Sequence, residues 1–169
     1  MLRVAGRTGT KLLTIGYEGL TPDEFLATLR HNGVVRVADV RQLPHSRKKG
    51  FSKTELAATL SASGIEYVGF PKLGTPAAVR DQYKESGDFA RLKRDYLVHL
   101  GSQGPAVEEL RELAARGGCA LLCFERDPAK CHRSILAEVL AGRTGSAFRV
   151  EHLGLRVEAA AQADLFGPA

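Results

Sequence analysis

The apolar run CALLCF at residues 119–124 decides the fold class of this chain. Such a short and continuous apolar run is typical of a strand covered on both faces, as the strands of a parallel sheet are. Two glycines, Gly117 and Gly118, precede the run, and a helical pattern through residues 135–140 follows it after a polar loop. We therefore expect this run to be the central strand of a sheet whose strands alternate with helices.

The rest of the chain alternates in the same way between short apolar runs and helical patterns. Capping boxes, in which Ser or Thr is followed three residues later by Glu, begin two helices after Thr21 and Ser52. The alternation predicts a single α/β domain, with a mainly parallel sheet of about five strands and helices on both faces, a Rossmann-like three-layer fold. Strands are expected at residues 11–16, 34–40, 65–70, 119–124 and 148–152. Helices are expected between Thr21 and Gly33, between Ser52 and Gly64, at residues 88–100 and 105–116, and through residues 135–140.

Length and composition are those of an ordinary globular protein. With 169 residues, 44% hydrophobic and 25% charged, the chain can form one hydrophobic core. We expect the α/β domain at residues 11–153, between a flexible segment at 1–10 and a flexible tail at 154–169. No run approaches the roughly 18 apolar residues of a membrane span, and the first residues lack the apolar centre of a signal peptide. A cytoplasmic protein without a membrane partner is therefore expected.

Three cysteines lie close together in the sequence, at Cys119, Cys123 and Cys131. An odd number in so short a segment argues against a disulfide scaffold and indicates free thiols in a reducing compartment. A structural zinc site that combines them with His132 is not expected. Four residues of extended strand separate Cys119 from Cys123 by about 13 Å, too far for both to bind one tetrahedral ion.

Residues 123–133, CFERDPAKCHR, hold most of the reactive side chains. Cys131 and His132 precede Ile135 and Leu136 by four positions, so a continuous helix places all four on its buried face. A cysteine at a helix amino terminus beside histidine can have a lowered pKa and act as a nucleophile. Alternatively, Cys131 only packs in the core and His132 bonds to the backbone.

Charged side chains follow the predicted carboxyl ends of two strands, where ligands of parallel sheets collect. Asp39 and Glu125 can converge there as acid and base, or as ligands of a magnesium ion beside a phosphate. Arg41 and Arg133 can grip an anion, because a guanidinium group binds phosphate or carboxylate through two parallel hydrogen bonds. Alternatively, these acids and arginines form ion pairs with one another.

The stretch RQLPHSRKKGFSK at residues 41–53 is the densest basic segment, with five Lys or Arg, one His and no acid. A formal net charge of +5 and a pI near 9.3 also favour acidic partners. The loop either follows a nucleic-acid backbone or is merely solvated. Its residues proposed to contact nucleic acid are His45, Arg47, Lys48 and Lys49.

Four further residues near the strand ends are candidates for binding a substrate. Ser46 belongs to the basic loop, and Tyr17 could stack on a base or cap the core. Gly16 and Gly74 allow the backbone to approach a ligand closely, although the geometry of a turn explains them equally well.

Four segments together resemble the family called domain of unknown function 488. They are TIGYEG at residues 14–19, DVRQLPHSR with GFS at residues 39–52, IEYVGFPKLG at residues 65–74 and LLCFERDPAKCHR at residues 121–133. The resemblance covers residues 13–140 and implies an α/β domain, but it supplies no reaction. The implied site consists of Asp39, Arg41, Pro44, Ser46, Gly74, Glu125, Cys131, His132 and Arg133. Thr75 stands where a second glycine is expected, which would alter the local turn.

The tail segment QADLF at residues 162–166 resembles the short peptide by which bacterial replication and repair proteins dock on the sliding DNA clamp. Leu165 and Phe166 would fill a hydrophobic pocket, and Gln162 with Asp164 would fix the register. Alternatively, Leu165 and Phe166 cover the surface of the domain.

Taken together, these features favour an enzyme or sensor that acts on a phosphate-bearing ligand, either a nucleotide or nucleic acid, in DNA repair or replication. The first alternative is a noncatalytic adaptor that binds DNA or a partner protein. The second is a hydrolase, transferase or redox enzyme with Cys131 as its nucleophile. Arg133 follows Cys131 by only two positions, so the five-residue loop of cysteine phosphatases is absent.

Overall fold

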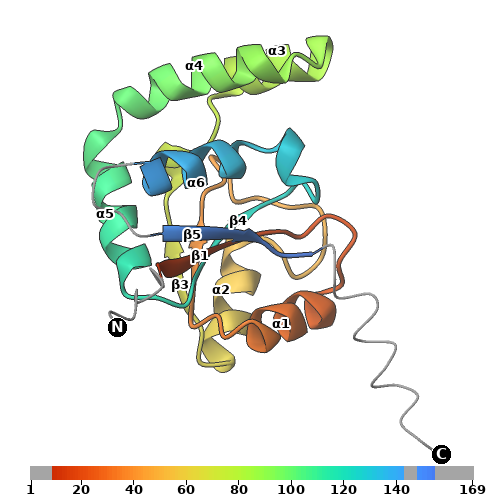
Figure 1. Ribbon diagram of the computed structural model, residues 1–169. Coiled ribbons are helices and arrows are strands. Elements are labelled where there is room, and N and C mark those ends of the chain that lie inside the picture. Colours follow the sequence, from red (N-terminus) through yellow and green to blue (C-terminus); the bar gives the residue numbers. More distant parts are fainter. Residues whose placement is uncertain (1–8, 143–147, 155–169) are drawn as a thin grey trace, which may run out of the picture.

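The centre of the molecule is a sheet of five parallel strands with helices on both faces (Figure 1). The computed structural model describes residues 9–142 and 148–154. In chain order the elements are β1 (Thr10–Gly16), α1 (Pro22–His31), β2 (Arg36–Asp39), α2 (Lys53–Ala62), β3 (Glu66–Gly69), η1 (Pro71–Leu73), α3 (Ala77–Ser86), α4 (Phe89–Gly101), α5 (Gly104–Ala115), β4 (Cys119–Cys123), η2 (Pro128–Lys130), α6 (His132–Gly142) and β5 (Phe148–His152). The α/β three-layer fold expected from the sequence is confirmed.

Strand β4 lies in the middle of the strand order β3-β2-β4-β1-β5, as the apolar run predicted. All of its residues are buried. Side chains alternate between the two faces of the sheet, so Cys119 and Leu121 enter one hydrophobic cluster while Ala120 and Leu122 enter the other. The strand is apolar at every position, and does not alternate between polar and apolar residues, because helices cover both faces of the sheet.

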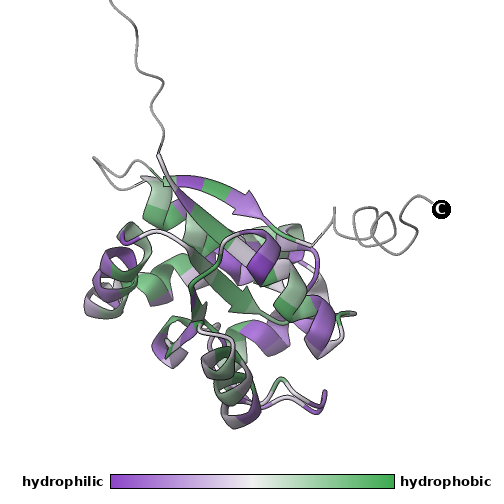
Figure 2. Cartoon of the chain, turned by 90° about the horizontal axis from the view of Figure 1, so that it is seen from below, coloured by the Kyte–Doolittle hydropathy of each residue, from purple (hydrophilic) through white to green (hydrophobic). Residues whose placement is uncertain are grey.

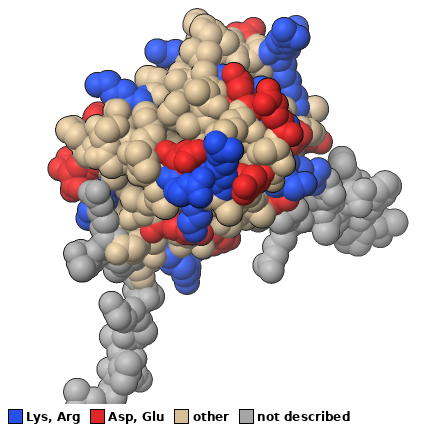
Figure 3. All heavy atoms as spheres, turned by 90° about the horizontal axis from the view of Figure 1, so that it is seen from above, with Lys and Arg blue, Asp and Glu red and all other residues tan. Residues whose placement is uncertain are grey.

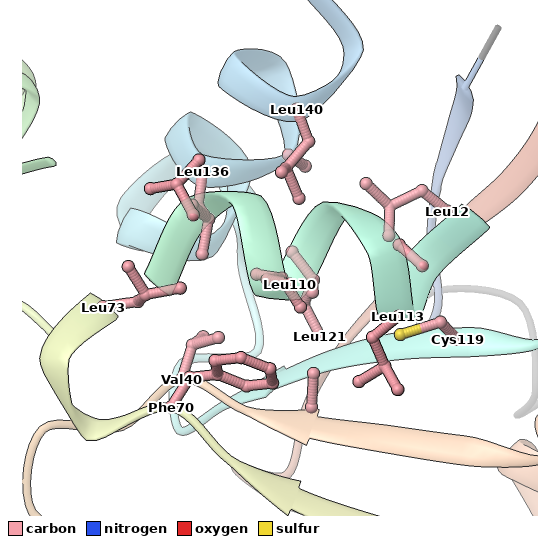
Figure 4. Close-up of a cluster of buried hydrophobic side chains, with 14 of the residues drawn as sticks. Leu12, Val40, Phe70, Leu73, Leu110, Leu113, Cys119, Leu121, Leu136 and Leu140 are labelled. Carbon is pink, nitrogen blue, oxygen red and sulfur yellow. The ribbon is translucent and has the colours of Figure 1, made fainter. Parts of the chain in front are cut away.

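The first cluster packs α4, α5 and α6 on one face, and the second packs α1 and α2 on the other. Figure 4 shows the first cluster, where Leu110 of α5 lies beside Leu121 of β4 and Leu136 of α6 lies on the other side of the α5 ribbon. Figure 2 shows the hydrophobic strands in the middle of the molecule, between helices that each carry hydrophilic residues as well. Burial on both faces explains why the sheet tolerates so apolar a central strand.

The two predicted capping boxes have different outcomes. At α1 the box is complete, because Thr21 N donates to the Glu24 carboxylate at 2.8 Å and Glu24 N donates to Thr21 Oγ1 at 3.2 Å. At α2 the Ser52 side chain makes no cap bond and instead donates to the Glu55 carboxylate at 2.9 Å. The same carboxylate accepts from Gly50 N at 3.0 Å, so it holds the end of the basic loop against the start of α2.

Helix α3 was not expected from the sequence. None of its residues is buried, and no side-chain cap marks its start. It packs on α4, where the rings of Tyr83 and Phe89 meet at 6.0 Å, and the two helices run along the top of the molecule in Figure 1. Figure 3 shows this side, on which basic and acidic side chains are interspersed. No helix in the described part of the chain is long and apolar enough to cross a membrane.

All five strands point the same way, so their carboxyl ends share one edge of the sheet. Two backbone hydrogen bonds tie the segments beyond β1 and β2 to β4: Tyr17 N donates to Cys123 O at 3.3 Å, and Val40 N donates to Leu122 O at 3.1 Å. The residues that follow β1, β2 and β4 are thereby brought together at the edge where the sequence predicts the site.

Candidate functional site

A cavity of about 750 Å³ opens at the carboxyl edge of the sheet. Its lining comes from the segments that follow β1, β2 and β4, from the basic loop, and from α3. Glu125 and His132, two of the candidate residues, line it together with Cys123. Segments far apart in the sequence therefore form one hollow of the size usual for small-molecule sites.

Two thiols and an imidazole gather at one side of this cavity. The donor atoms of Cys123, Cys131 and His132 all lie within 4.8 Å of one another. Cys123 Sγ is 3.7 Å from His132 Nδ1 and 3.2 Å from the Glu125 carboxylate. Cys131 precedes α6 directly and is only 1% exposed. It does not line the cavity, unlike Cys123, so its sulfur lies beneath the surface on which a substrate would rest.

The imidazole of His132 is held in one orientation. Its Nε2 lies 2.9 Å from the carbonyl oxygen of Val40. A carbonyl oxygen only accepts hydrogen bonds, so Nε2 carries the proton and donates. The edge of the Tyr96 ring packs against the imidazole at 5.2 Å, and Tyr96 is itself fixed by a 2.6 Å bond to Leu73 O. Nδ1 is therefore the ring atom directed at the sulfur atoms.

The surroundings separate the pKa values of the two thiols. Burial alone would raise the pKa of Cys131, but hydrogen bonds with Cys123 and His132 and the charges of His132 and Arg133 hold it well below its usual value. For Cys123, the hydrogen bond to Cys131 and burial both raise the pKa well above the usual value. Cys131 is therefore the thiol that ionises first.

The other two groups of the cluster shift as well. Burial acts to lower the pKa of His132, but the hydrogen bond and charge of Cys131, the bond to Val40 O and the charge of Glu125 together raise it above its usual value. Burial raises the pKa of Glu125, and the neighbouring Cys131 raises it further. A carboxyl group that gains a proton more readily and lines a cavity has the properties of a general acid or base.

Asp39 and Arg41 form the buried ion pair that the sequence left as an alternative. Arg41 Nε and Nη2 bind the two oxygens of Asp39 at 2.9 and 2.7 Å, and Tyr67 OH donates to the same carboxylate at 2.6 Å. Asp39 is 1% exposed and does not line the cavity. The prediction that Asp39 acts as an acid, a base or a magnesium ligand is therefore corrected, since its oxygens are already occupied by donors.

Arg41 lines the cavity, but most of its donors bind the protein. Besides the two bonds to Asp39, Nη1 donates to Phe51 O at 2.8 Å and to Tyr17 OH at 3.2 Å. Burial alone would lower the pKa of Arg41, but the bonds and charge of Asp39 raise it, so the guanidinium stays charged. Of its five N–H groups, these bonds occupy four, and it faces the cavity mainly as a positive charge.

The prediction that Arg133 grips an anion is also corrected. Arg133 is 0% exposed and does not line the cavity. Its guanidinium donates to the carbonyl oxygens of Glu125 and Arg126 and to Thr14 Oγ1. It therefore supports the loop after β4 from below, as a buried arginine bonded to carbonyl groups can.

Other basic side chains take the place of Arg133 around the cavity. Arg47 was predicted from the basic loop, but Arg80, Lys84 and Lys130 were not. Arg80 and Lys84 belong to α3, whose position over the strand ends cannot be read from its sequence. Among the described residues that line the cavity, Glu125 is the only acid. Basic side chains therefore outnumber acidic ones among these lining residues.

The basic loop divides into two groups. His45, Ser46 and Arg47 line the cavity, and Ser46 Oγ accepts a hydrogen bond from Tyr17 OH at 3.2 Å. Lys48 instead turns inward, donates to Tyr17 O at 3.3 Å and lies over the ring of Phe51. Lys49 is exposed and does not line the cavity. The bond to Tyr17 O uses one of the three N–H donors of the Lys48 ammonium group, so contact between Lys48 and nucleic acid stays a prediction.

Tyr17 lines the cavity, but little of its ring is exposed for stacking on a base. It is 3% exposed, stacks on Phe51 at 4.5 Å and meets the edge of Phe124 at 5.3 Å. Phe124, which is 44% exposed and lines the cavity, is the aromatic side chain that sequence reasoning missed. In the sequence Phe124 is the last residue of the apolar run at 119–124, so no sequence signal marks it as exposed.

Gly16 and Gly74 provide a close backbone approach, but to the protein rather than to a ligand. A Cβ atom on Gly16 would lie 1.8 Å from Glu125 O, and one on Gly74 would lie 2.1 Å from Gln42 N. Neither glycine lines the cavity. Both are therefore positioning residues, and Gly16 brings the end of β1 against the backbone that carries Glu125. Thr75, next to Gly74, is buried and lines the cavity.

Comparison with known proteins gives a family but no activity. The model of the family described as domain of unknown function DUF488 matches residues 21–140. The chain belongs to this family. No curated protein and no solved structure matches the DUF488 chain. The resemblance seen in the sequence is thus confirmed, and the function has to be argued from the site.

Proposed function

We propose that this DUF488 protein is an enzyme that binds the phosphate group of a nucleotide or nucleic-acid strand in the cavity at the carboxyl edge of the sheet. The observation that carries the proposal is the charge of the cavity. Its basic lining residues are Arg41, Arg47, Arg80, Lys84 and Lys130. Against them stands Glu125, the only acid among the described lining residues. Such an excess of positive charge favours a polyanionic ligand.

The uncharged part of the lining suits a nucleobase. Leu43 and Phe124 are 59% and 44% exposed, and both line the cavity together with Tyr83. Exposed aromatic and aliphatic side chains beside basic groups are typical of surfaces that stack bases while binding the backbone. The combination favours a nucleotide unit over free inorganic phosphate.

Glu125 is the residue to which we assign proton transfer in this cavity. Gly16 brings β1 so close to the carbonyl of Glu125 that no larger residue fits, and Arg133 binds the same carbonyl from below. The backbone that carries the carboxylate is thus fixed from two sides. A side chain held in this way can act on a ligand without a large loss of conformational entropy.

Binding of labelled nucleotides and of single- and double-stranded oligonucleotides, measured at several salt concentrations, tests the proposal. Arg47→Ala and Arg80→Ala should each weaken binding and reduce the slope of log K against log salt by about 1. Arg30→Ala is the matched control, because Arg30 is exposed in the last turn of α1 and does not line the cavity. Binding that is indifferent to Arg47→Ala and Arg80→Ala would refute it.

A substitution at Glu125 distinguishes an enzyme from a noncatalytic adaptor. Glu125→Gln keeps the shape of the side chain but removes its acid–base function, so it should abolish turnover and retain binding. Candidate reactions are screened with the bound nucleotide or strand as substrate. If the wild-type protein changes none of these ligands chemically, the enzyme hypothesis is refuted and the noncatalytic adaptor is favoured instead.

The tail peptide at residues 162–166 lies outside the described residues, so its role is argued from the sequence alone. We propose that it docks the protein on the bacterial sliding clamp, which would place a nucleic-acid enzyme on DNA. Binding to immobilised clamp should disappear when Leu165 and Phe166 are both replaced by alanine. No binding by the intact protein would end this proposal.

A further inference from the structure

Cys123, Cys131 and His132 bring two sulfur atoms and one imidazole nitrogen together beside the cavity. The three donor atoms lie within 4.8 Å of one another, and Cys123 Sγ is 3.7 Å from His132 Nδ1. In a tetrahedral zinc site with Zn–S of about 2.3 Å and Zn–N of about 2.0 Å, a sulfur and a nitrogen ligand are about 3.5 Å apart. The spacing of Cys123 and His132 is therefore close to that of two ligands of one ion.

His132 already has the hydrogen bonding of a metal ligand. Its Nε2–H donates to Val40 O, so Nδ1 is the ring atom directed at the sulfur atoms and the one that an ion would bind after the loss of any proton there. Metal-binding histidines commonly donate their other ring N–H to a backbone carbonyl, since this bond fixes the tautomer and the ring plane. The ring of Tyr96 against the imidazole restricts it further. Little rearrangement is then needed to bind an ion.

We infer that Cys123, Cys131 and His132 bind a zinc ion at the base of the cavity. Two cysteine sulfurs and one imidazole nitrogen are ligands that Zn²⁺ prefers over magnesium or calcium. Binding releases two protons to solvent, one from Cys123 and one from the hydrogen-bonded Cys131–His132 pair, and no group is oxidised or reduced. The ion and two thiolates together carry no net charge, so the buried sulfur atoms need no further counter-charge.

The chain supplies three ligands, which leaves the fourth position of a tetrahedral ion for another group. The carboxylate of Glu125 lies 3.2 Å from Cys123 Sγ, and both residues line the cavity together with His132. Zinc sites with three protein ligands and an open fourth position activate a water molecule or bind a substrate atom. The inference does not depend on a phosphate-bearing ligand, but it would place a Lewis acid where such a ligand binds.

Cys119 is excluded from the site and provides a matched control. It lies at the other end of β4, at 0% exposure in the first hydrophobic cluster, and Figure 4 shows its sulfur near Leu113. The distance between Cys119 and Cys123 along the strand, expected from the sequence, therefore excludes a metal site that contains both of them. It does not exclude a site that contains only Cys123. Cys119→Ser and Cys131→Ser make the same chemical change at two fully buried thiols.

Metal binding by the reduced full-length protein, with Zn²⁺ and Co²⁺ as probes, tests the inference. We expect one zinc per chain after removal of excess metal, and with Co²⁺ the charge-transfer absorption of thiolate ligands and the intense visible bands of tetrahedral cobalt. In competition with a chromophoric chelator, Cys131→Ser and His132→Gln should lower zinc affinity by at least about 100-fold. Cys119→Ser should bind zinc as the wild type does.

Two results would overturn the inference. One is reduced wild-type protein that takes up no zinc and shows no thiolate-to-cobalt absorption, a measurement that needs no variant to fold. The other is loss of the cobalt absorption in Cys119→Ser to the same extent as in Cys131→Ser. Oligonucleotide binding is measured separately in the presence of a strong chelator, so failure of the zinc site and failure of the proposed anion site are distinguishable.

Discussion

Replacement of Arg41 by methionine should destabilise the protein strongly through the ion pair that this residue forms with Asp39. Met replaces the aliphatic part of the arginine side chain but removes the guanidinium. Asp39 then keeps only two of its four donors, the backbone N of Arg41 at 3.1 Å and Tyr67 OH at 2.6 Å. The carboxylate is 1% exposed, so water cannot replace the lost bonds without a change in structure.

The size of this effect follows from the two bonds to Asp39 that are lost, at 2.9 and 2.7 Å. A hydrogen bond to a charged group contributes roughly 1.5–3 kcal/mol, and removal of one partner of a buried pair costs about 3–5 kcal/mol. We therefore expect Arg41→Met to lower the free energy of unfolding by about 3–5 kcal/mol. In the double variant with Asp39→Leu, no buried charge is left without a partner. Its destabilisation should be smaller than the sum of the two single variants by about 2 kcal/mol.

Urea unfolding followed by far-ultraviolet circular dichroism measures these values, provided that the dependence on urea is the same for each variant. Lys93→Met is the control, because Lys93 binds Glu138 at 2.9 Å but both side chains are largely exposed. It should cost less than about 1 kcal/mol. If Arg41→Met costs no more than Lys93→Met, the Asp39 pair does not stabilise the fold and Arg41 is free to serve the cavity.

Three further predictions concern other parts of the fold. Gly16→Ala places a Cβ 1.8 Å from Glu125 O and should lower the free energy of unfolding by about 3 kcal/mol or more, because the backbone of Glu125 has to move. A loss below about 1 kcal/mol would contradict the close approach of the two backbones. Leu110→Ala, at 0% exposure, should cost about 2–5 kcal/mol in the same urea assay, whereas Val98→Ala at 73% exposure should change stability little, and equal effects would contradict the packing. Burial lowers the pKa of His152 below its ordinary 6.5, so the unfolded chain binds more protons and stability falls as the pH drops through this value. His152→Gln should flatten this dependence between neutral and mildly acidic pH, and an unchanged profile would contradict the shift.

The interior strands could be predicted from the sequence because burial on both faces has a direct signature. CALLCF at residues 119–124 is apolar throughout, and its neighbours in the sheet were recognised in the same way. Helix α1 was predicted for a similar reason, since Thr21 and Glu24 form a local capping pattern. Helix α3 has no buried residue and no side-chain cap at its start, so no strong local signal marks it in the sequence, and it packs against α4.

The candidate site could be predicted only in part. Its location at the carboxyl edge and the presence of Glu125 and His132 follow from strand polarity and from the order of residues after β4. Which arginine faces the cavity does not. Arg41 and Arg133 look alike in sequence, yet one lines the cavity and the other is bonded to backbone carbonyls below it.

The apolar run at residues 119–124 by itself determined the fold class, because the local pattern of buried residues specifies a central parallel strand. Tertiary structure alone decided the chemistry at the end of that strand. Cys119 and Cys123 are separated along β4, whereas Cys123, Cys131 and His132 meet because the loop after β4 folds back onto the sheet before α6 begins. Distances along a strand can be calculated from the sequence, but the path of an irregular loop depends on contacts such as those of Gly16 and Arg133 with the backbone of Glu125.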